Sequence, residues 1–269
     1  MAPRLPKGLA DPSRFPTAEA AEAHFLRMWR LNRMDPGELA TLLSGPREET
    51  RAWIESAARY GVTEAQLQLG QLLLDDRDEL AALRWFRRAA RSSPEAMNMV
   101  GRCMENGWGA TQDLEDATRW YLRSAEAGHD WGQYNYANML FSGRGIDLDQ
   151  AEAVVWYRKA AARGHSRAMN LLARCREEGW GAERDPVEAY RWYRRSAEAG
   201  YFRAQFNLGT ILTGQGQIEE ALDWFKRACD AAMPDSRDVM VHALASHANP
   251  KISRLGRTLR DASPRPRPQ

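Results

Sequence analysis

The feature that most constrains this chain is a long segment that occurs twice. Residues 102–128 and residues 174–200 are identical at 18 of 27 aligned positions and lie 72 residues apart. Residues 155–164 repeat the end of this segment at half that offset. A repeat of this length is typical of stacked-repeat proteins, in which each unit packs only against its neighbours. The sequence therefore predicts a single elongated repeat body.

Each unit is predicted to hold two helices. In the second helix, one apolar stripe recurs at i, i+3, i+4, i+7 and i+8. In one unit it consists of Ala117, Trp120, Tyr121, Ser124 and Ala125. The stripe is too narrow to close a core within one unit, so the next unit must complete its burial. We expect Trp120, Trp156 and Trp192 to occupy equivalent core sites.

Glycines mark the ends and the close contacts of these helices. Gly128 follows the second helix, because glycine takes the left-handed cap conformation without steric cost. Gly209 lies inside a first helix, where it costs about 1 kcal/mol relative to alanine. That cost is tolerable if a partner helix packs against the bare backbone. Gly-x-Gly loops are expected to join the helices of a pair, at residues 107–109, 143–145, 179–181 and 214–216.

These motifs resemble the Sel1-like repeat, a relative of the tetratricopeptide repeat. The shared pattern is Ala-x-x-x-Leu-Gly, a Gly-x-Gly loop, and Ala-x-x-Trp-Tyr-x-x-Ala-Ala-x-x-Gly. The resemblance implies an all-α fold, a right-handed α-solenoid of stacked antiparallel helix pairs with capping helices at both ends. Five Sel1-like repeats are expected within residues 63–232, at about 63–93, 94–128, 129–164, 165–200 and 201–232.

Two of these units depart from the pattern. The first has Asp-Asp-Arg-Asp at residues 75–78 in place of the Gly-x-Gly loop. The step from Trp53 to Trp85 and the step from Trp192 to Trp224 are both 32 residues. The first and last units are therefore expected to be closer to the tetratricopeptide repeat.

The two ends of the chain are predicted to differ from the repeats. Residues 1–16 are rich in proline and expected to be disordered, and residues 17–62 are expected to form N-terminal capping helices or, alternatively, a separate docking element. Residues 233–261 are predicted to be C-terminal capping helices, followed by a disordered basic and proline-rich tail at 262–269. Lys251, Arg254, Arg257 and Arg260 recur beside Ile252, Leu255 and Leu259. This segment either docks on the final cap or is a free basic arm.

Composition limits the classes of partner and compartment. The net charge is +2, but residues 35–232 carry 25 basic and 30 acidic side chains. An acidic repeat body between basic ends does not indicate a nucleic-acid-binding protein. No apolar run approaches the length of a transmembrane helix, and the first residues lack the apolar core of a signal peptide. These features favour a cytoplasmic protein without a transmembrane segment.

The sequence indicates no catalytic, metal or cofactor site. His129 and His165 follow the capping glycines of successive units, so repeat geometry accounts for them. His242 and His247 are five residues apart, which does not match the i, i+4 spacing of a helical zinc site. Cys103 and Cys175 lie two units apart, too far for a disulfide, and together with Cys229 they are expected to be core residues. We therefore predict no enzyme activity and no cofactor.

A partner-binding groove is the expected functional site. In repeats of this family, by resemblance, the first helices line the concave face. The groove residues are then Asn98, Arg102, Trp131, Tyr134, Asn138, Phe141, Asn170, Arg174 and Phe206. The asparagines would pair with a bound backbone, and some of the rings could instead belong to the core between helices. Trp108 and Trp180, in Gly-Trp-Gly loops, either fold over their own stack or offer a second contact at the loop edge.

The sequence therefore predicts a protein–protein interaction scaffold or adaptor that binds a protein or peptide, without catalysis. The alternative is a regulatory protein associated with membrane or nucleic acid through the basic C-terminal segment. On the favoured interpretation there is no specific nucleic-acid partner, and peripheral membrane contact would involve only the C-terminal basic helix.

Overall fold

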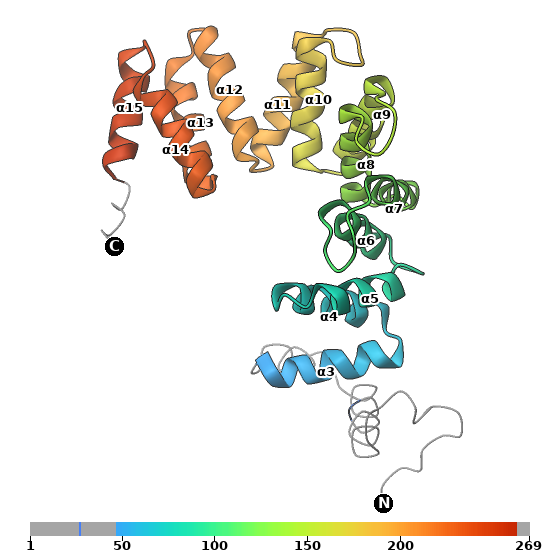
Figure 1. Cartoon of the computed structure of the whole chain (residues 1–269). Helices are drawn as coiled ribbons and strands as arrows, with labels where there is room; N and C mark the ends of the chain where they lie inside the picture. The colour runs from blue at the N-terminus through green and yellow to red at the C-terminus, as the bar shows by residue number, and fades with distance from the viewer. Residues whose placement is uncertain (1–26, 28–46, 263–269) are drawn as a thin grey trace, which may run out of the picture. The chain divides into compact units, whose positions relative to one another are not determined.

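A computed structural model describes residue 27 and residues 47–262, and the statements below concern these residues (Figure 1). This part of the chain contains helices and no strand. The chain divides into two compact units, Met1–Trp120 and Tyr121–Gln269, which are described separately. The expectations for residues 1–16, for capping helices before residue 47 and for residues 263–269 lie outside the described residues.

From residue 47 onward, the first unit holds helix α3 (Arg47–Tyr60), a helix pair and the start of a second pair. The pair is α4 (Thr63–Asp75) with α5 (Glu79–Ala89), and α6 (Pro94–Asn106) begins the next. Helix α7 (Leu114–Glu126) contains the boundary between the two units. Each of α3, α4 and α5 contacts the helix that follows it. Helix α3 falls within residues 17–62, the segment predicted to form N-terminal capping helices.

The second unit continues the series of helix pairs. Its helices are α8 (Asp130–Ser142), α9 (Gln150–Ala162), α10 (Ser166–Glu178), α11 (Pro186–Glu198), α12 (Phe202–Gly214), α13 (Ile218–Ala231), α14 (Pro234–Ala245) and α15 (Pro250–Asp261). Every helix from α8 to α14 contacts the next one along the chain. The predicted all-α architecture of adjacent helix pairs is confirmed.

The link between paired helices explains the two different repeat lengths. Seven residues separate α8 from α9 and α10 from α11, whereas three separate α4 from α5 and α12 from α13. The difference of four residues equals the shortening of the Trp-to-Trp steps from 36 to 32. The predicted loop at 214–216 is corrected accordingly, because Gly214 is the last residue of α12.

Glycines and aromatic rings fit together inside the pairs. A Cβ at Gly70 would lie 2.5 Å from Phe86, and one at Gly209 would lie 2.7 Å from Phe225, so each glycine receives a ring against its backbone. Both rings are buried. The expected role of Gly209 is confirmed. Its cost in helix propensity is offset by the close approach of the second helix.

The tyrosines, and not the tryptophans, are the deepest aromatic residues of the middle units. Tyr121, Tyr157 and Tyr193 are almost fully buried, whereas Trp120 and Trp192 are half-buried and only Trp156 is buried. The expectation that the three tryptophans share a core site is therefore wrong for two of them. Consecutive residues of a helix point about 100° apart. Here each tyrosine, one residue after its tryptophan, faces the paired helix.

Two buried hydroxyl groups join these tyrosines to first helices. The Tyr157 hydroxyl donates a 2.7 Å hydrogen bond to Asn138 Oδ1, and the Tyr193 hydroxyl donates a 2.7 Å hydrogen bond to Glu177 Oε2. Burial raises the pKa of both phenols. Each bond satisfies a polar atom that would otherwise destabilise the core.

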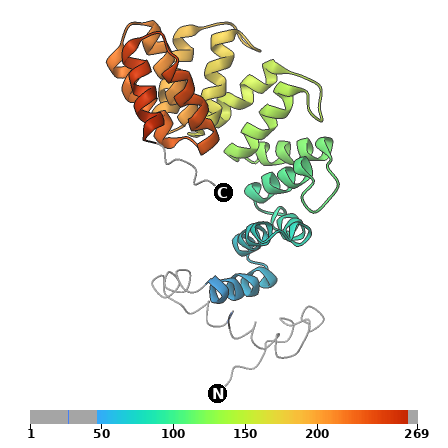
Figure 2. The same cartoon turned by 60° about the vertical axis from the view of Figure 1, so that its left-hand side comes forward.

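The C-terminal helix docks on the repeats instead of forming a free arm. Ile252 and Leu259 are buried in one core cluster with residues of α12, α13 and α14. A Cβ at Gly256 would lie 2.2 Å from the backbone nitrogen of Ala245, so α14 and α15 approach closely (Figure 2). The four basic side chains are exposed, and Lys251 pairs with Glu219. The structure gives no support to the alternative function through this segment.

The three cysteines are buried and free, as expected for core residues. Burial raises the pKa of the Cys103 thiol to about 12 and of the Cys175 and Cys229 thiols to about 11. All three therefore stay protonated and unreactive at neutral pH.

Candidate functional site

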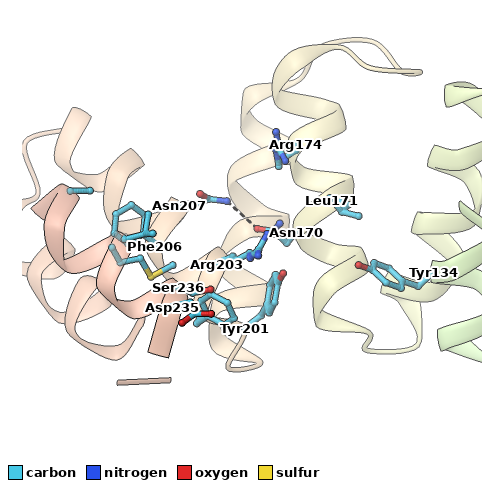
Figure 3. Close-up of a pocket in the computed structure, with 14 residues that line it drawn as sticks. Tyr134, Asn170, Leu171, Arg174, Tyr201, Arg203, Phe206, Asn207, Asp235 and Ser236 are labelled. Carbon is cyan, nitrogen blue, oxygen red and sulfur yellow. Dashed lines mark hydrogen bonds between the residues drawn. The ribbon is translucent and has the colours of Figure 1, made fainter. Parts of the chain in front are cut away.

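A cavity of about 640 Å³ lies in the second unit, on successive first helices. It is lined by one residue of α8, three of α10, the start of α12 and the adjoining face of α14 (Figure 3). These residues are Tyr134, Asn170, Leu171, Arg174, Tyr201, Phe202, Arg203, Phe206, Asn207, Asp235, Ser236, Val239, Met240 and Ala243. The cavity thus combines apolar side chains with two arginines and one carboxylate.

Helical spacing places these side chains on one face of each helix. On α10, Asn170 and Arg174 are four residues apart, and on α12, Arg203 and Phe206 are three apart. On α14, Asp235 and Val239 are again four apart. Residues three or four positions apart lie one above the other on a helix. Because α14 follows α13 as α12 follows α11, its face continues the surface of the preceding first helices.

The asparagines take part in packing, which differs from the expectation that they offer free amides. Asn98 is 5% exposed and Asn170 is 4% exposed. Asn207 Nδ2 donates a 3.1 Å hydrogen bond to Asn170 Oδ1 across α12 and α10, drawn as the dashed line in Figure 3. Asn138 Oδ1 accepts a hydrogen bond from the Tyr157 hydroxyl. Asn138 and Asn170 therefore hold neighbouring helices together.

The predicted aromatic set divides into two groups. Trp131 and Tyr134, near the start of α8, pack around His165, with ring centroids 4.5 Å and 4.7 Å away. Phe141, at the other end of α8, instead packs on Trp180 at 5.7 Å and on Tyr157 at 6.3 Å. Of these three rings on α8, only Tyr134 reaches the cavity, which the fourth predicted ring, Phe206 of α12, also lines.

His165 is the buried centre of the first aromatic group. Its Nδ1 accepts a 3.1 Å hydrogen bond from the backbone N–H of Ala168, so its proton is on Nε2, which is buried without a partner. Burial, aided by Arg167 and His129 and opposed by Asp130, lowers the pKa of His165 to about 4. The ring is neutral at pH 7. His129 caps α8 in the same way, so repeat geometry accounts for both histidines, as predicted.

Trp180 belongs with the first helix of its own repeat. The Arg174 guanidinium lies 5.2 Å from its ring centroid, and Phe141 of the preceding repeat packs against it. A Cβ at Gly181 would lie 2.1 Å from the carbonyl oxygen of Gln150, so the loop presses on the start of α9. Trp180 is therefore continuous with Arg174, which lines the cavity.

In the first unit, Arg102 and Trp108 form the same pair, at 5.3 Å. Asn98, Arg102 and Trp108 lie in the first unit, and the other predicted site residues lie in the second. That Arg102 and Arg174 belong to one groove stays a prediction.

The sequence indicated Arg174 and Phe206 but not the wall formed by α14. The sequence predicts only a cap in this segment, because the cavity residues Asp235, Ser236, Val239 and Met240 carry no repeat motif. Val239 is 70% exposed although it is apolar. The sequence feature that could have revealed this wall is the position of α14 in the chain, which is that of the next first helix in the series.

Comparison with known families identifies the repeats. The Sel1 repeat model matches residues 63–93, 94–129, 132–165 and 166–201, which together are half of the chain. The chain belongs to the Sel1 repeat family. The unit at residues 202–232 matches the tetratricopeptide repeat, as expected for the last unit. The same expectation is wrong for the first unit, which matches the Sel1 repeat although its link also has three residues. Proteins built from Sel1 and tetratricopeptide repeats generally bind other proteins.

Several solved structures share this fold. A protective antigen of uropathogenic Escherichia coli strains, displaying an SLR fold, is similar at 27% identity and a TM-score of 0.63, over 80% of this chain and 50% of that chain. This chain therefore spans half the length of the antigen. A Sel1 repeat protein from Oxalobacter formigenes is similar at 22% identity and a TM-score of 0.67, over 79% of this chain and 94% of that chain. An immunity protein from Pseudomonas aeruginosa is similar at 17% identity and a TM-score of 0.52, over 72% and 74%.

A comparison with curated protein sequences finds no match. Among the described residues, no helix is long and apolar enough to cross a membrane, and no group of His, Cys, Asp and Glu is placed to hold a metal ion.

Proposed function

We propose that this Sel1 repeat protein is a non-catalytic interaction scaffold that binds an extended segment of a partner protein in the cavity of α10, α12 and α14. One observation carries the proposal. Three successive first helices turn apolar and polar side chains toward a single open cavity of about 640 Å³. Extended peptides are bound in this way, by pockets for side chains and polar groups that fix their orientation.

Apolar anchoring is expected at the wall between α12 and α14. Phe206 and Met240 are half-buried, and Val239 is exposed, so each has surface left to cover. Burying a fully exposed side chain of this size contributes about 1.5–3 kcal/mol, so the half-buried Phe206 and Met240 would each contribute part of that. A small number of anchors of this kind usually dominates the affinity of an interface.

A longer bound segment would continue along α10 toward Trp180. Arg174 borders the cavity and lies on the Trp180 ring, which packs on Phe141. These three side chains would give a second contact area at the far end of α10. On this proposal, the predicted groove and the loop edge are two ends of one surface.

The test is selection from a random-peptide display library, followed by affinity measurement with one selected peptide. Val239→Gln places a longer polar side chain in the cavity, and Val187→Gln makes the same change at a valine on α11 that is 63% exposed and outside the cavity. We expect V239Q to lose most of the affinity and V187Q to keep it. If both variants bind the peptide as the unsubstituted protein does, the cavity is not the binding site.

A further inference from the structure

Positively charged side chains outnumber negatively charged ones around the cavity. Arg174 and Arg203 line it, and the only carboxylate in the lining is that of Asp235. A third cation, Arg167, lies 6.0 Å from the ring of Tyr201, which also lines the cavity. This local excess of positive charge stands out, since residues 35–232 carry more acidic than basic side chains.

Two arginines on the same helix show what distinguishes the cavity. Arg176 on α10 faces away from the cavity and forms ion pairs with Asp185 and Glu188. Arg174, two positions earlier, forms no ion pair among the described residues. The same holds for Arg167 and Arg203 within the part of the chain that the structure describes. On the outer side of α10 the fold therefore supplies carboxylate partners for Arg176, whereas Arg174 on the cavity side is paired with none within residues 47–262.

Aromatic rings hold these three guanidinium groups in place. Arg174 lies 5.2 Å from the Trp180 ring, Arg203 lies 5.7 Å from the Phe202 ring, and Arg167 lies 5.2 Å from the Trp131 ring. A guanidinium held against a ring keeps N–H donors at its edge, and its fork matches a carboxylate in two parallel hydrogen bonds. Ordering these side chains before binding reduces the entropy lost when the ligand arrives.

We infer that the partner segment is acidic. Its Asp or Glu side chains pair with Arg174 and Arg203, beside an apolar side chain that lies against Phe206, Val239 and Met240. Internal acidic side chains fit better than a chain terminus, because a C-terminal carboxylate supplies one charge and the cations come from two helices. Asp235 repels acidic groups from the α14 wall, so the acidic side chains lie toward Arg174 and Arg203 and the apolar side chain lies toward α14. This inference rests on the function proposed above.

The test uses the random-peptide display library on the full chain and on two charge-reversed variants. R174E/R203E reverses the cavity arginines. R191E/K226E makes the same charge change in the same two repeats, on exposed residues of α11 and α13 that do not line the cavity. All four positions are exposed, so thermal unfolding should show little change in either variant.

We expect the unsubstituted protein and R191E/K226E to enrich peptides with Asp or Glu next to an apolar residue. R174E/R203E should lose that preference and bind a selected acidic peptide at least about tenfold more weakly, since hydrogen bonds to charged groups usually contribute this much. Affinity for the unsubstituted protein should fall when salt is raised to about 0.5 M, because the pairs are partly exposed.

Each other outcome overturns the inference in a recognisable way. If the unsubstituted protein enriches no peptide, both the proposed function and this inference fail. If peptides are enriched and depend on Val239 but show no acidic preference, only this inference fails. The same is true if R174E/R203E keeps the preference, or if binding requires a free C-terminal carboxylate. Displacement of the peptide by single-stranded RNA, lost in R174E/R203E, would instead indicate a nucleic-acid site.

Discussion

The start of α8 and the face between α12 and α14 differ in what their apolar side chains already contact. At the start of α8, Trp131 and Tyr134 pack on each other, at 6.0 Å, and on His165. Between α12 and α14, Val239 is largely exposed and borders an open cavity. The rings at the start of α8 are thus already packed on one another, although Trp131 is still 40% exposed. The α14 wall of the cavity leaves more apolar surface uncovered, because Val239 is 70% exposed. The number of aromatic residues therefore does not locate the open site, since Tyr201, Phe202 and Phe206 also line the cavity.

The largest expected effect is in the closed core. Tyr157→Ala should lower the free energy of unfolding by about 3–5 kcal/mol, because it leaves a cavity and removes the hydrogen bond to Asn138. Val239→Ala, at the open wall, should change it by less than about 0.5 kcal/mol. Urea unfolding followed by circular dichroism measures both. Equal losses for the two variants would contradict the distinction between a closed and an open region.

The docking of α15 gives the next effect. Ile252→Ala should cost about 2–4 kcal/mol, since this side chain is fully buried in the core that α12 and α13 share. Lys251→Ala removes only an exposed ion pair with Glu219 and should cost less than about 1 kcal/mol. Thermal unfolding compares them. A larger loss for K251A than for I252A would mean that charge, and not burial, holds the helix.

The pH dependence of the free energy of unfolding should reflect the titration of the buried His165. The folded-state pKa of His165 is lowered to about 4, below an unfolded value near 6.5, so the unfolded chain binds this proton first. The stability contributed by the neutral ring is complete above pH 6.5 and is lost as pH falls toward 4, by up to about 3 kcal/mol. His165→Asn, which keeps a capping acceptor, should have a flatter profile over that window. An unchanged profile would place the titrating group elsewhere.

Two glycines of α12 test how closely this helix packs against α13. Gly209→Ala should destabilise by about 1–3 kcal/mol, because its Cβ would overlap Phe225, despite the gain in helix propensity. Gly214→Ala, at the open end of the same helix, meets nothing within 4 Å and should be neutral or slightly stabilising. Chemical unfolding of both variants decides whether the ring contact matters. A stabilised G209A would contradict the packing described for α12 and α13.

Much of the fold could be predicted because the same helix-pair motif recurs several times along the sequence. The period located the helix pairs, and Gly107, Gly143 and Gly179 end first helices in the left-handed conformation that glycine favours. The pattern could not rank Trp192 against Tyr193, because both lie on the apolar side of the helix and only the position of the paired helix separates them.

The candidate site was less predictable, for a physical reason. Arg174 and Phe206 follow from the register of the first helices, whereas Val239 lies on a helix without the repeat signature. Whether a polar residue such as Asn170 is open or buried depends on its neighbour, here Asn207 on the next first helix. The sequence pattern of one repeat unit does not show which residue of the next unit will cover a given side chain.

The most direct test of the central claim is site-specific photo-crosslinking to a selected peptide. Benzoylphenylalanine is placed at position 239 in one protein and at position 187 in another, since both native valines are exposed. The account predicts a crosslinked product from position 239 that excess unlabelled peptide suppresses, and none from position 187. Crosslinking from position 187, or from neither position while the peptide still binds, would contradict a binding site between α12 and α14.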